Sequence, residues 1–271
     1  MGPLLTLPVL HTLRAAAAAG MASAECSLDL QRSSLRVALD ADGFFHAGIR
    51  YPLPARVRDR TIYHWHDGEF IPTQRFSGAL IKLVPTDWGP PTFEIDGIKM
   101  LPTAKVSPWT DAEVKVALIE PRGKVILDCC GGLGYFAAWC IEGRARQIVS
   151  FEKNPDVIWL RGLNPWSPPA NAPLSLELAD VSKHIATLAT SSVDAILHDP
   201  PRFGIAGELY SLAFYEQLAR VIRRKGRLFH YTGSPNRLTS NRDVPKEVAK
   251  RLKQCGFTTT VTRDGLLATK T

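Results

Sequence analysis

From about Trp109 to the C-terminus, short apolar runs alternate with longer amphipathic segments. The runs "KVILD", "QIVSFE", "LSLELAD", "VDAILHD" and "GRLFHYT" are typical of buried strands, and the segments between them have helical spacing. Repeated strand–helix units predict a mainly parallel, doubly wound sheet. The last two runs, "FTTTVTR" and "GLLATKT", are joined at Asp264–Gly265, so we expect a terminal antiparallel hairpin. The pattern therefore predicts an α/β fold for residues 109–271.

The chain before Trp109 has a different pattern. Residues 26–108 contain short β-like pieces broken by Gly, Pro and Asp, with hairpin signals at Asp42–Gly43 and Asp96–Gly97. The first 24 residues contain no acidic side chain and include "RAAAAAG". We expect residues 1–25 to be a disordered or targeting segment, residues 26–108 to be a strand-rich region, and residues 109–271 to form the main domain.

Composition narrows the class of protein. Apolar residues make up 45% of the 271 residues and charged residues 22%, as in ordinary globular enzymes, and no apolar run approaches a membrane span. Five cysteines without framework spacing predict reduced thiols in an intracellular protein. We expect a cytoplasmic protein, or a plastid or mitochondrial one if residues 1–25 are a transit peptide, and no membrane partner.

The net charge of +7 favours a polyanionic partner such as RNA. Much of the excess lies in "RVIRRKGR" (220–227) and "KEVAKRLKQ" (246–254). Such runs also occur as solvated helix faces, so both interpretations stay open. The sequence says nothing about the oligomeric state.

The stretch "VILDCCGGLGYFA" has the most specific pattern for ligand binding. A buried strand ends in Asp128, and Gly132 and Gly134 precede a helix, as in turns that let the backbone approach a ligand. The next strand ends in Glu152, twenty residues after Gly132, where a carboxylate can accept both hydroxyls of a ribose. The third strand is followed by Asp180 and Val181, which suit an adenine amino group and ring.

A fourth acidic residue, Asp199, ends the run "VDAILHD" and is followed by Pro200 and Pro201, which stop the strand. Aspartate is also a common helix N-cap, which is the simpler interpretation for any one of these residues. The whole series, together with the glycine turn, favours a ligand site at the carboxyl ends of the strands.

These residues resemble the class I S-adenosylmethionine-dependent methyltransferases over residues 109–271. More closely, "PTDWGPPTFEIDGIKM", "HDPPRF" and "AGELYSLAFYEQLARV" resemble a family of predicted methyltransferases found largely in archaea. The resemblance implies a seven-stranded Rossmann-like sheet with S-adenosylmethionine as cofactor. It implies that the loop from Cys130 to Gly134 holds the methionine end, with Cys130 standing where the family has its first glycine.

The resemblance also assigns the remaining roles. Asp128 would hold the cofactor's amino group, Glu152 its ribose, and Asp180 with Val181 its adenine, while Trp109, Thr110 and Asp111 would cover the carboxylate end. In related enzymes a "D/N-P-P-aromatic" turn accepts the hydrogens of a target amine, so Asp199, Pro200 and Pro201 are the candidate catalytic residues. The candidate substrate residues are Arg202, Phe203, Trp88 (in a lid or wall, 85–91), His198 and His230.

Methylation of nitrogen fits this turn better than methylation of carbon. Enzymes that methylate C5 of pyrimidines need a cysteine, and the turn "TGSPN" has Gly233 where that thiol would lie. The substrate we expect is a base in structured RNA such as tRNA, or else a small amine.

Four alternatives remain. "GELYSLAFYEQLARV" and "TFEIDGIKMLPT" also resemble the polyamine aminopropyltransferases, although a Tyr-His pair of that family is absent. A catalytically inactive binding module of the same fold is possible. His198 and His230 are proton acceptors or satisfied core histidines. His64 and His66 in "YHWH", with Asp67, are the only metal pattern, and we expect no metal.

Overall fold

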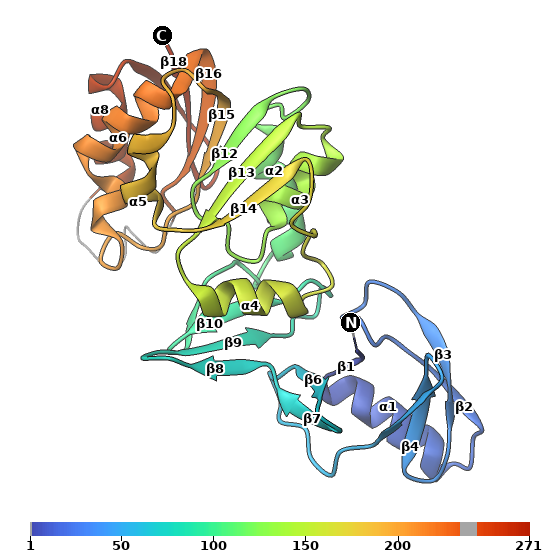
Figure 1. Ribbon diagram of the computed structural model, residues 1–271. Coiled ribbons are helices and arrows are strands. Elements are labelled where there is room, and N and C mark those ends of the chain that lie inside the picture. The colour runs from blue at the N-terminus through green and yellow to red at the C-terminus, as the bar shows by residue number, and fades with distance from the viewer. Residues whose placement is uncertain (1, 234–242) are drawn as a thin grey trace. The chain divides into compact units, whose positions relative to one another are not determined.

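The computed structural model describes residues 2–233 and 243–271. The chain forms two compact units, one made of residues 1–110 with 159–167 and the other of residues 111–158 with 168–271 (Figure 1). The sequence pattern placed residues 159–167 with the second part, whereas their contacts lie in the first. Within the described residues, no helix is both long and apolar enough to cross a membrane.

The second unit contains the predicted doubly wound sheet. Its strands are β12 (Val125–Asp128), β13 (Gln147–Glu152), β14 (Leu174–Leu178), β15 (Val193–His198), β16 (Ile222–Tyr231), β17 (Phe257–Val261) and β18 (Gly265–Lys270). They lie in the order β14-β13-β12-β15-β16-β18-β17. All neighbours are parallel except β16–β18 and β18–β17. The seven-stranded Rossmann-like sheet with its terminal antiparallel hairpin is therefore confirmed.

Helices follow the strands as the alternating pattern predicts. They are α2 (Pro108–Ala117), α3 (Tyr135–Glu142), α4 (Pro155–Leu163), α5 (Val181–His184), α6 (Leu212–Val221) and α8 (Val244–Gln254), with 3-10 turns at Ile185–Thr187 and Gly207–Tyr210. α5, α6 and α8 cover one face of the sheet (Figure 1), and their apolar side chains share one core with β12, β15 and β16. Burial of this face is the main force that holds the unit together.

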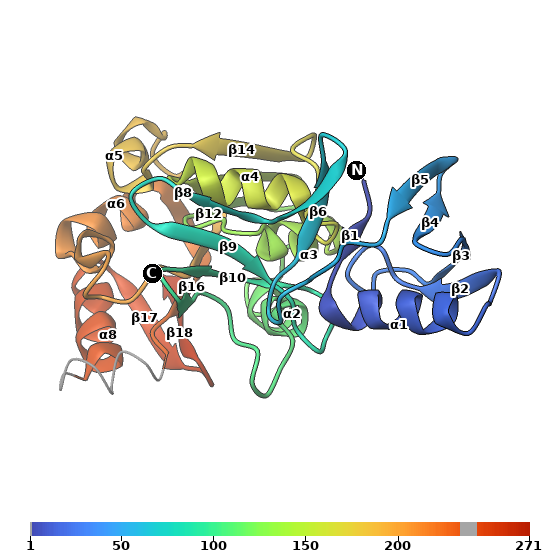
Figure 2. The same ribbon diagram turned by 90° about the horizontal axis from the view of Figure 1, so that it is seen from below.

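The first unit is built from short antiparallel strands. Its elements are β1 (Leu4–Leu5), α1 (Leu7–Ala18), β2 (Ser23–Cys26), β3 (Leu35–Leu39), β4 (Gly43–His46), β5 (Ile49–Pro52), β6 (Tyr63–His66), β7 (Glu69–Pro72), β8 (Gln74–Phe76), β9 (Leu80–Val84), β10 (Thr92–Ile95) and β11 (Ile98–Lys99). They form three sheets, β2-β3-β4-β5, β1-β6-β7 and β11-β10-β9-β8 (Figure 2). The predicted hairpin at Asp96–Gly97 joins β10 to β11.

The prediction that residues 1–25 are disordered is wrong. These residues form β1, α1 and the start of β2, and Leu5, Leu10 and Leu13 are at most 1% exposed. The helix begins after Thr6 with Pro8 in its first turn, where the missing N–H costs nothing. Its apolar face completes a core with Ala24, Val37, Phe44 and Tyr51. The segment is ordered because Leu10 and Leu13 have helical spacing and pack against the sheet β2-β3-β4-β5.

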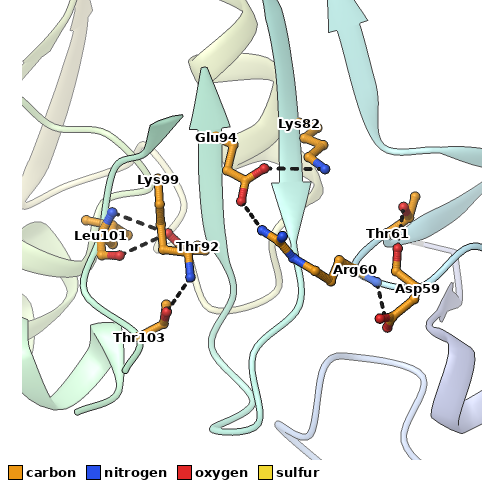
Figure 3. A network of polar contacts seen from close by, with 9 residues as sticks. All are labelled: Asp59, Arg60, Thr61, Lys82, Thr92, Glu94, Lys99, Leu101 and Thr103. Carbon is orange, nitrogen blue, oxygen red and sulfur yellow. Dashed lines mark hydrogen bonds and ion pairs between the residues drawn. The ribbon is translucent and has the colours of Figure 1, made fainter. Parts of the chain in front are cut away.

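A buried carboxylate ties the loop 53–62 to the sheet of β9 and β10. Glu94 on β10 has a side chain 4% exposed, and it pairs with Arg60 from the loop and with Lys82 Nζ on β9 at 3.3 Å (Figure 3). A buried carboxylate without a cationic partner destabilises the folded state. Arg60 and Lys82 therefore stabilise the fold by compensating the charge of Glu94. Beside it, the Oγ1 of Thr92 accepts a hydrogen bond from the backbone N–H of Leu101.

Candidate active site

The order of the strands locates a ligand site. The chain runs from β12 outward to β13 and β14, then returns to the other side of β12 with β15. Ligands of open α/β sheets bind outside the carboxyl ends of the strands at such a reversal. Asp128 ends β12, and Asp199 directly follows the last residue of β15, so these two carboxylates lie at the reversal.

The glycine turn after β12 is shaped by its backbone. Gly132 and Gly134 have φ of +48° and +83°, a region that favours glycine, while Cys130 is not among the described residues with positive φ. Glu152, at the end of β13, accepts the backbone N–H of Gly132 at 3.0 Å and that of Asn154 at 2.9 Å. The carboxylate therefore lies against the glycine turn.

The other two predicted cofactor carboxylates differ in burial. Asp128 is 1% exposed and accepts the hydroxyl of Ser150, its neighbour on β13, at 2.7 Å. Asp180 is the N-cap of α5, where its Oδ1 accepts the backbone N–H and the hydroxyl of Ser182. Val181 behind it is 4% exposed and belongs to the core. Asp180 thus does cap a helix, as the simpler interpretation expected, with Oδ2 as the oxygen left to a ligand.

Asp199 lies in a charged cluster that includes a buried lysine. Lys115 Nζ on α2 lies 2.7 Å from Asp111 Oδ2 and 3.1 Å from Asp199 Oδ2, and its side chain is 5% exposed. Burial alone would lower the pKa of Lys115, but attraction to Asp199 and Asp111 raises it, so the side chain is a permanent cation. The same ammonium lies 4.4 Å from the ring centre of Tyr231. Burial and then Asp199 raise the pKa of Tyr231 to about 12.

The second of the two prolines after Asp199 is held by the following turn. The hydroxyl of Tyr210 donates to the carbonyl of Pro201 at 3.0 Å, and the rings of Tyr210 and Phe203 meet edge to face at 5.5 Å. One of the two proline carbonyls is therefore occupied by the protein itself. Arg202, which directly follows Pro201, is exposed.

His198 and His230 lie side by side inside the protein. Both are 0% exposed, and their ring centres are 4.5 Å apart. Nε2 of His198 donates to the carbonyl of Leu209, while His230 donates from Nδ1 to the carbonyl of Tyr231 and accepts the hydroxyl of Tyr215. Burial lowers the pKa of His198 to about 4 and that of His230 well below its ordinary value. This placement favours the interpretation of both as neutral core histidines.

Three predicted side chains, those of Trp88, Trp109 and Thr110, belong to the first unit. Trp88 is 48% exposed, and its indole N–H donates to the carbonyl of Thr103. Trp109 packs its ring on Trp166, 5.3 Å between centres. Asp111, the third residue of that stretch, lies in the second unit, where it pairs with Lys115.

The histidine pattern of β6 is not accompanied by further ligands. Nδ1 of His64 lies 3.1 Å from the hydroxyl of Thr73, and His66 Nε2 lies 3.3 Å from Asp67. Among residues 2–233 and 243–271, no group of three or more His, Cys, Asp or Glu side chains is placed to hold a metal ion.

The basic run 220–227 lies away from the carboxyl ends of the strands. It starts in α6 and enters β16 beside Val193, the first residue of β15. Arg220 donates to the carbonyls of Ile185 and Leu188, Arg223 pairs with Asp194, and Arg227 pairs with Glu120. Much of this charge therefore holds the fold together, and it supports an RNA partner less than the sequence indicated.

The thiol beside the glycine turn is not activated. Burial, followed by the nearby thiol and carboxylates, raises the pKa of Cys130 well above its ordinary value. A neutral thiol is a poor nucleophile. Gly233 takes the position of the expected thiol in "TGSPN", and residues 234–236 of that turn lie outside the described residues.

Lys115 and Tyr210 are the site residues that the sequence analysis missed. Lys115 follows Asp111 by four residues on a predicted helix, and that spacing alone indicates an ion pair. Its second contact, to Asp199, joins residues 84 apart in the chain and depends on packing.

No family model matches the chain. The protein is 38% identical over 198 residues to the uncharacterized protein MJ1233 of Methanocaldococcus jannaschii, an alignment that covers 72% of this chain and 68% of that protein.

Solved structures share the fold at low sequence identity. A spermidine synthase in complex with the transition state analogue AdoDATO is 16% identical and has a TM-score of 0.59 over 75% of this chain and 76% of that one. The spermidine synthase of Thermotoga maritima is 15% identical, with a TM-score of 0.56 over 77% and 79% of the two chains. MNMC2 of Aquifex aeolicus is 20% identical, with a TM-score of 0.52 over 72% and 71%.

Identities this low show the fold alone, and that fold is the class I one shared by S-adenosylmethionine-dependent methyltransferases and spermidine synthases. The relative from M. jannaschii is more similar in sequence than these solved structures. With 38% identity and two thirds of that relative covered, the protein belongs to the same family as MJ1233.

Proposed function

We propose that the protein is an S-adenosylmethionine-dependent methyltransferase that methylates a nitrogen, with a base in structured RNA as the acceptor. The observation that carries the proposal is the position of Asp199 at the strand reversal. Lys115 binds its Oδ2, and no hydrogen bond from another described residue reaches its Oδ1, which a ligand can therefore use. The carbonyl of Pro200 follows in the same turn, and that of Pro201 is engaged by Tyr210.

The residues at the strand ends suit this cofactor. Its ribose and amino groups are hydrogen-bond donors. The acidic side chains of Asp128, Glu152 and Asp180 lie at or just after the carboxyl ends of β12, β13 and β14. The cofactor supplies an electrophilic methyl group when bound. In this proposal the protein's part is to hold the cofactor along these strand ends and to exclude water from the transfer.

Asp199 would orient the acceptor. Its free oxygen and the Pro200 carbonyl accept the two hydrogens of an amine, which directs the nitrogen lone pair toward the methyl group. S-adenosylmethionine would supply the methyl group, and the electron pair of the broken carbon–sulfur bond would stay with sulfur as the nitrogen takes that methyl group. The proton that the methylated nitrogen then loses passes to Asp199 or to water. Catalysis of this kind is mostly positioning.

Glu152 provides a direct test of the cofactor site. We expect Glu152→Ala to weaken binding of S-adenosylmethionine by about 1.5–3 kcal/mol, because a charged acceptor of two hydroxyls is lost. Titration calorimetry on the purified protein measures this. Glu208→Gln removes an exposed carboxylate, paired only loosely with Lys153 at 3.7 Å, and serves as the control. Unchanged affinity in Glu152→Ala, or no binding to the unmodified protein at millimolar cofactor, would contradict the assignment.

The acceptor is identified by transfer of label. The protein is incubated with tritiated-methyl cofactor and separate fractions of cellular RNA, protein and small molecules, and in parallel with decarboxylated cofactor and putrescine. Label in RNA is the expected result. Label only among small molecules would make a small amine the acceptor, and propylamine transfer to putrescine would make the protein an aminopropyltransferase. Cofactor binding with no transfer to any fraction would indicate an inactive binding module.

A further inference from the structure

Lys115 places its ammonium group directly beside the proposed acceptor position. Its ammonium touches one oxygen of Asp199 at 3.1 Å and one of Asp111 at 2.7 Å. The side chain is nearly fully buried, lined by the rings of Phe136, Phe229 and Tyr231 at 4.4–6.0 Å from the nitrogen. Water screens such a charge weakly, so it acts on whatever binds at Asp199.

The charge of the cluster depends on this lysine. Asp111 and Asp199 are 12% and 20% exposed, and a third carboxylate, Asp264, is near enough to contribute to the raised pKa of Asp111. Without Lys115 the cluster would consist of carboxylates and would attract cationic amines. Lys115 offsets one of these charges, and it occupies one oxygen of Asp111.

Resting on the function proposed above, we propose that Lys115 selects the class of acceptor: it favours an uncharged amine, such as the exocyclic amine of a nucleobase, and weakens the binding of protonated polyamines. An uncharged amine still donates to the free oxygen of Asp199, because a neutral N–H group is not repelled by the neighbouring ammonium. A protonated diamine bound at the same oxygen would lie within a few ångströms of a second cation. Lys115 is thus a positioning and specificity residue that acts through Asp199.

The test measures diamine binding to Lys115→Met. Putrescine is titrated calorimetrically into the unmodified protein and the variant, both saturated with S-adenosylhomocysteine. We expect the variant to bind putrescine at least about tenfold more tightly, since one unit charge is removed from a poorly screened site. A lysine with a merely structural role would not produce this gain of affinity.

Lys124→Met is the matched control. It removes the same formal charge from a half-buried lysine of the same unit, whose ammonium donates to the carbonyl of Ile119 and not to the cluster. We expect its putrescine affinity to equal that of the unmodified protein. If melting curves show that Lys115→Met does not fold, Lys115→Gln replaces it, because an amide of similar length can still donate to one carboxylate.

The experiment distinguishes failure of the proposed function from failure of the inference about Lys115. Absence of S-adenosylhomocysteine binding to the unmodified protein contradicts the proposed function, whatever Lys115 does. With that ligand bound, equal putrescine affinity of the unmodified protein and the lysine variant, including no binding by either, overturns the inference about Lys115 alone.

Discussion

Asp199→Asn should lower methyl transfer about 10²–10⁴-fold, the usual loss when a positioned acid–base group is removed. The asparagine amide has the size of the aspartate side chain but cannot take the proton that the methylated nitrogen loses. Its NH₂ group is a hydrogen-bond donor, and it would face the N–H groups of the acceptor amine. Lys115 would keep its stronger contact, to Asp111, so the fold should survive. The measurement is the initial rate of tritium transfer into the fraction that accepts label.

The strand that carries Asp199 offers its own control. Asp194 lies at the other end of β15, where it accepts the backbone N–H of Val125 and pairs with Arg223. Asp194→Asn removes the same charge from the same strand and should retain most of the activity. Cofactor affinity of Asp199→Asn should stay close to that of the unmodified protein. A variant that keeps more than about a tenth of the activity would remove Asp199 from the proposed role.

Deletion of residues 1–25 should unfold the first unit. The deletion removes four leucines that are at most 2% exposed, Leu4, Leu5, Leu10 and Leu13. Burial of such side chains contributes about 1.5–3 kcal/mol each, and their sum is comparable to the total stability of a domain. β6 and β3 would also lose their antiparallel neighbours β1 and β2.

Limited proteolysis and near-ultraviolet circular dichroism measure this loss. We expect the truncated chain to be cleaved rapidly before residue 110, while a chain lacking only residues 1–3 resists as the full protein does. Leu13→Ala is a milder version, expected to cost about 2–5 kcal/mol, with the exposed His11→Ala on the same helix as its control. Protease resistance and a melting temperature unchanged by the 25-residue deletion would show that α1 contributes little.

The sheet of the second unit could be predicted because its central strands, β12, β13 and β15, are short, mainly apolar runs that end in an acidic residue or are directly followed by one. The same runs placed Asp128, Glu152 and Asp199 at the carboxyl ends of strands, since parallel strands all end at one edge. The helix at Leu7–Ala18 was missed although Leu10, Leu13 and Ala16 have helical spacing. Five consecutive alanines and the absence of acidic side chains resemble a targeting segment, and what makes the helix stable is the sheet it covers.

Side-chain partners across long sequence separations could not be predicted. Lys115 reaches Asp199 only because α2 packs at the end of β15. His198 is the last residue of β15 and His230 the last but one of β16, and periodicity does not tell whether a side chain near the end of a strand faces solvent or the core. The arginines of the run 220–227 illustrate the same limit, because their internal partners lie up to 109 residues away.

The inclusion of residues 159–167 in the first unit means that the chain passes between the units at three points. Trp166 donates its indole N–H to the carbonyl of Leu30, and Arg32 donates to the carbonyl of Pro165. A fragment starting at residue 111 would carry these partners without the surface they bind, and a fragment ending at residue 110 would lack them. Neither unit is therefore a transferable module: the two cannot be dissected by a single cut, swapped between homologues at one junction, or inherited separately by recombination.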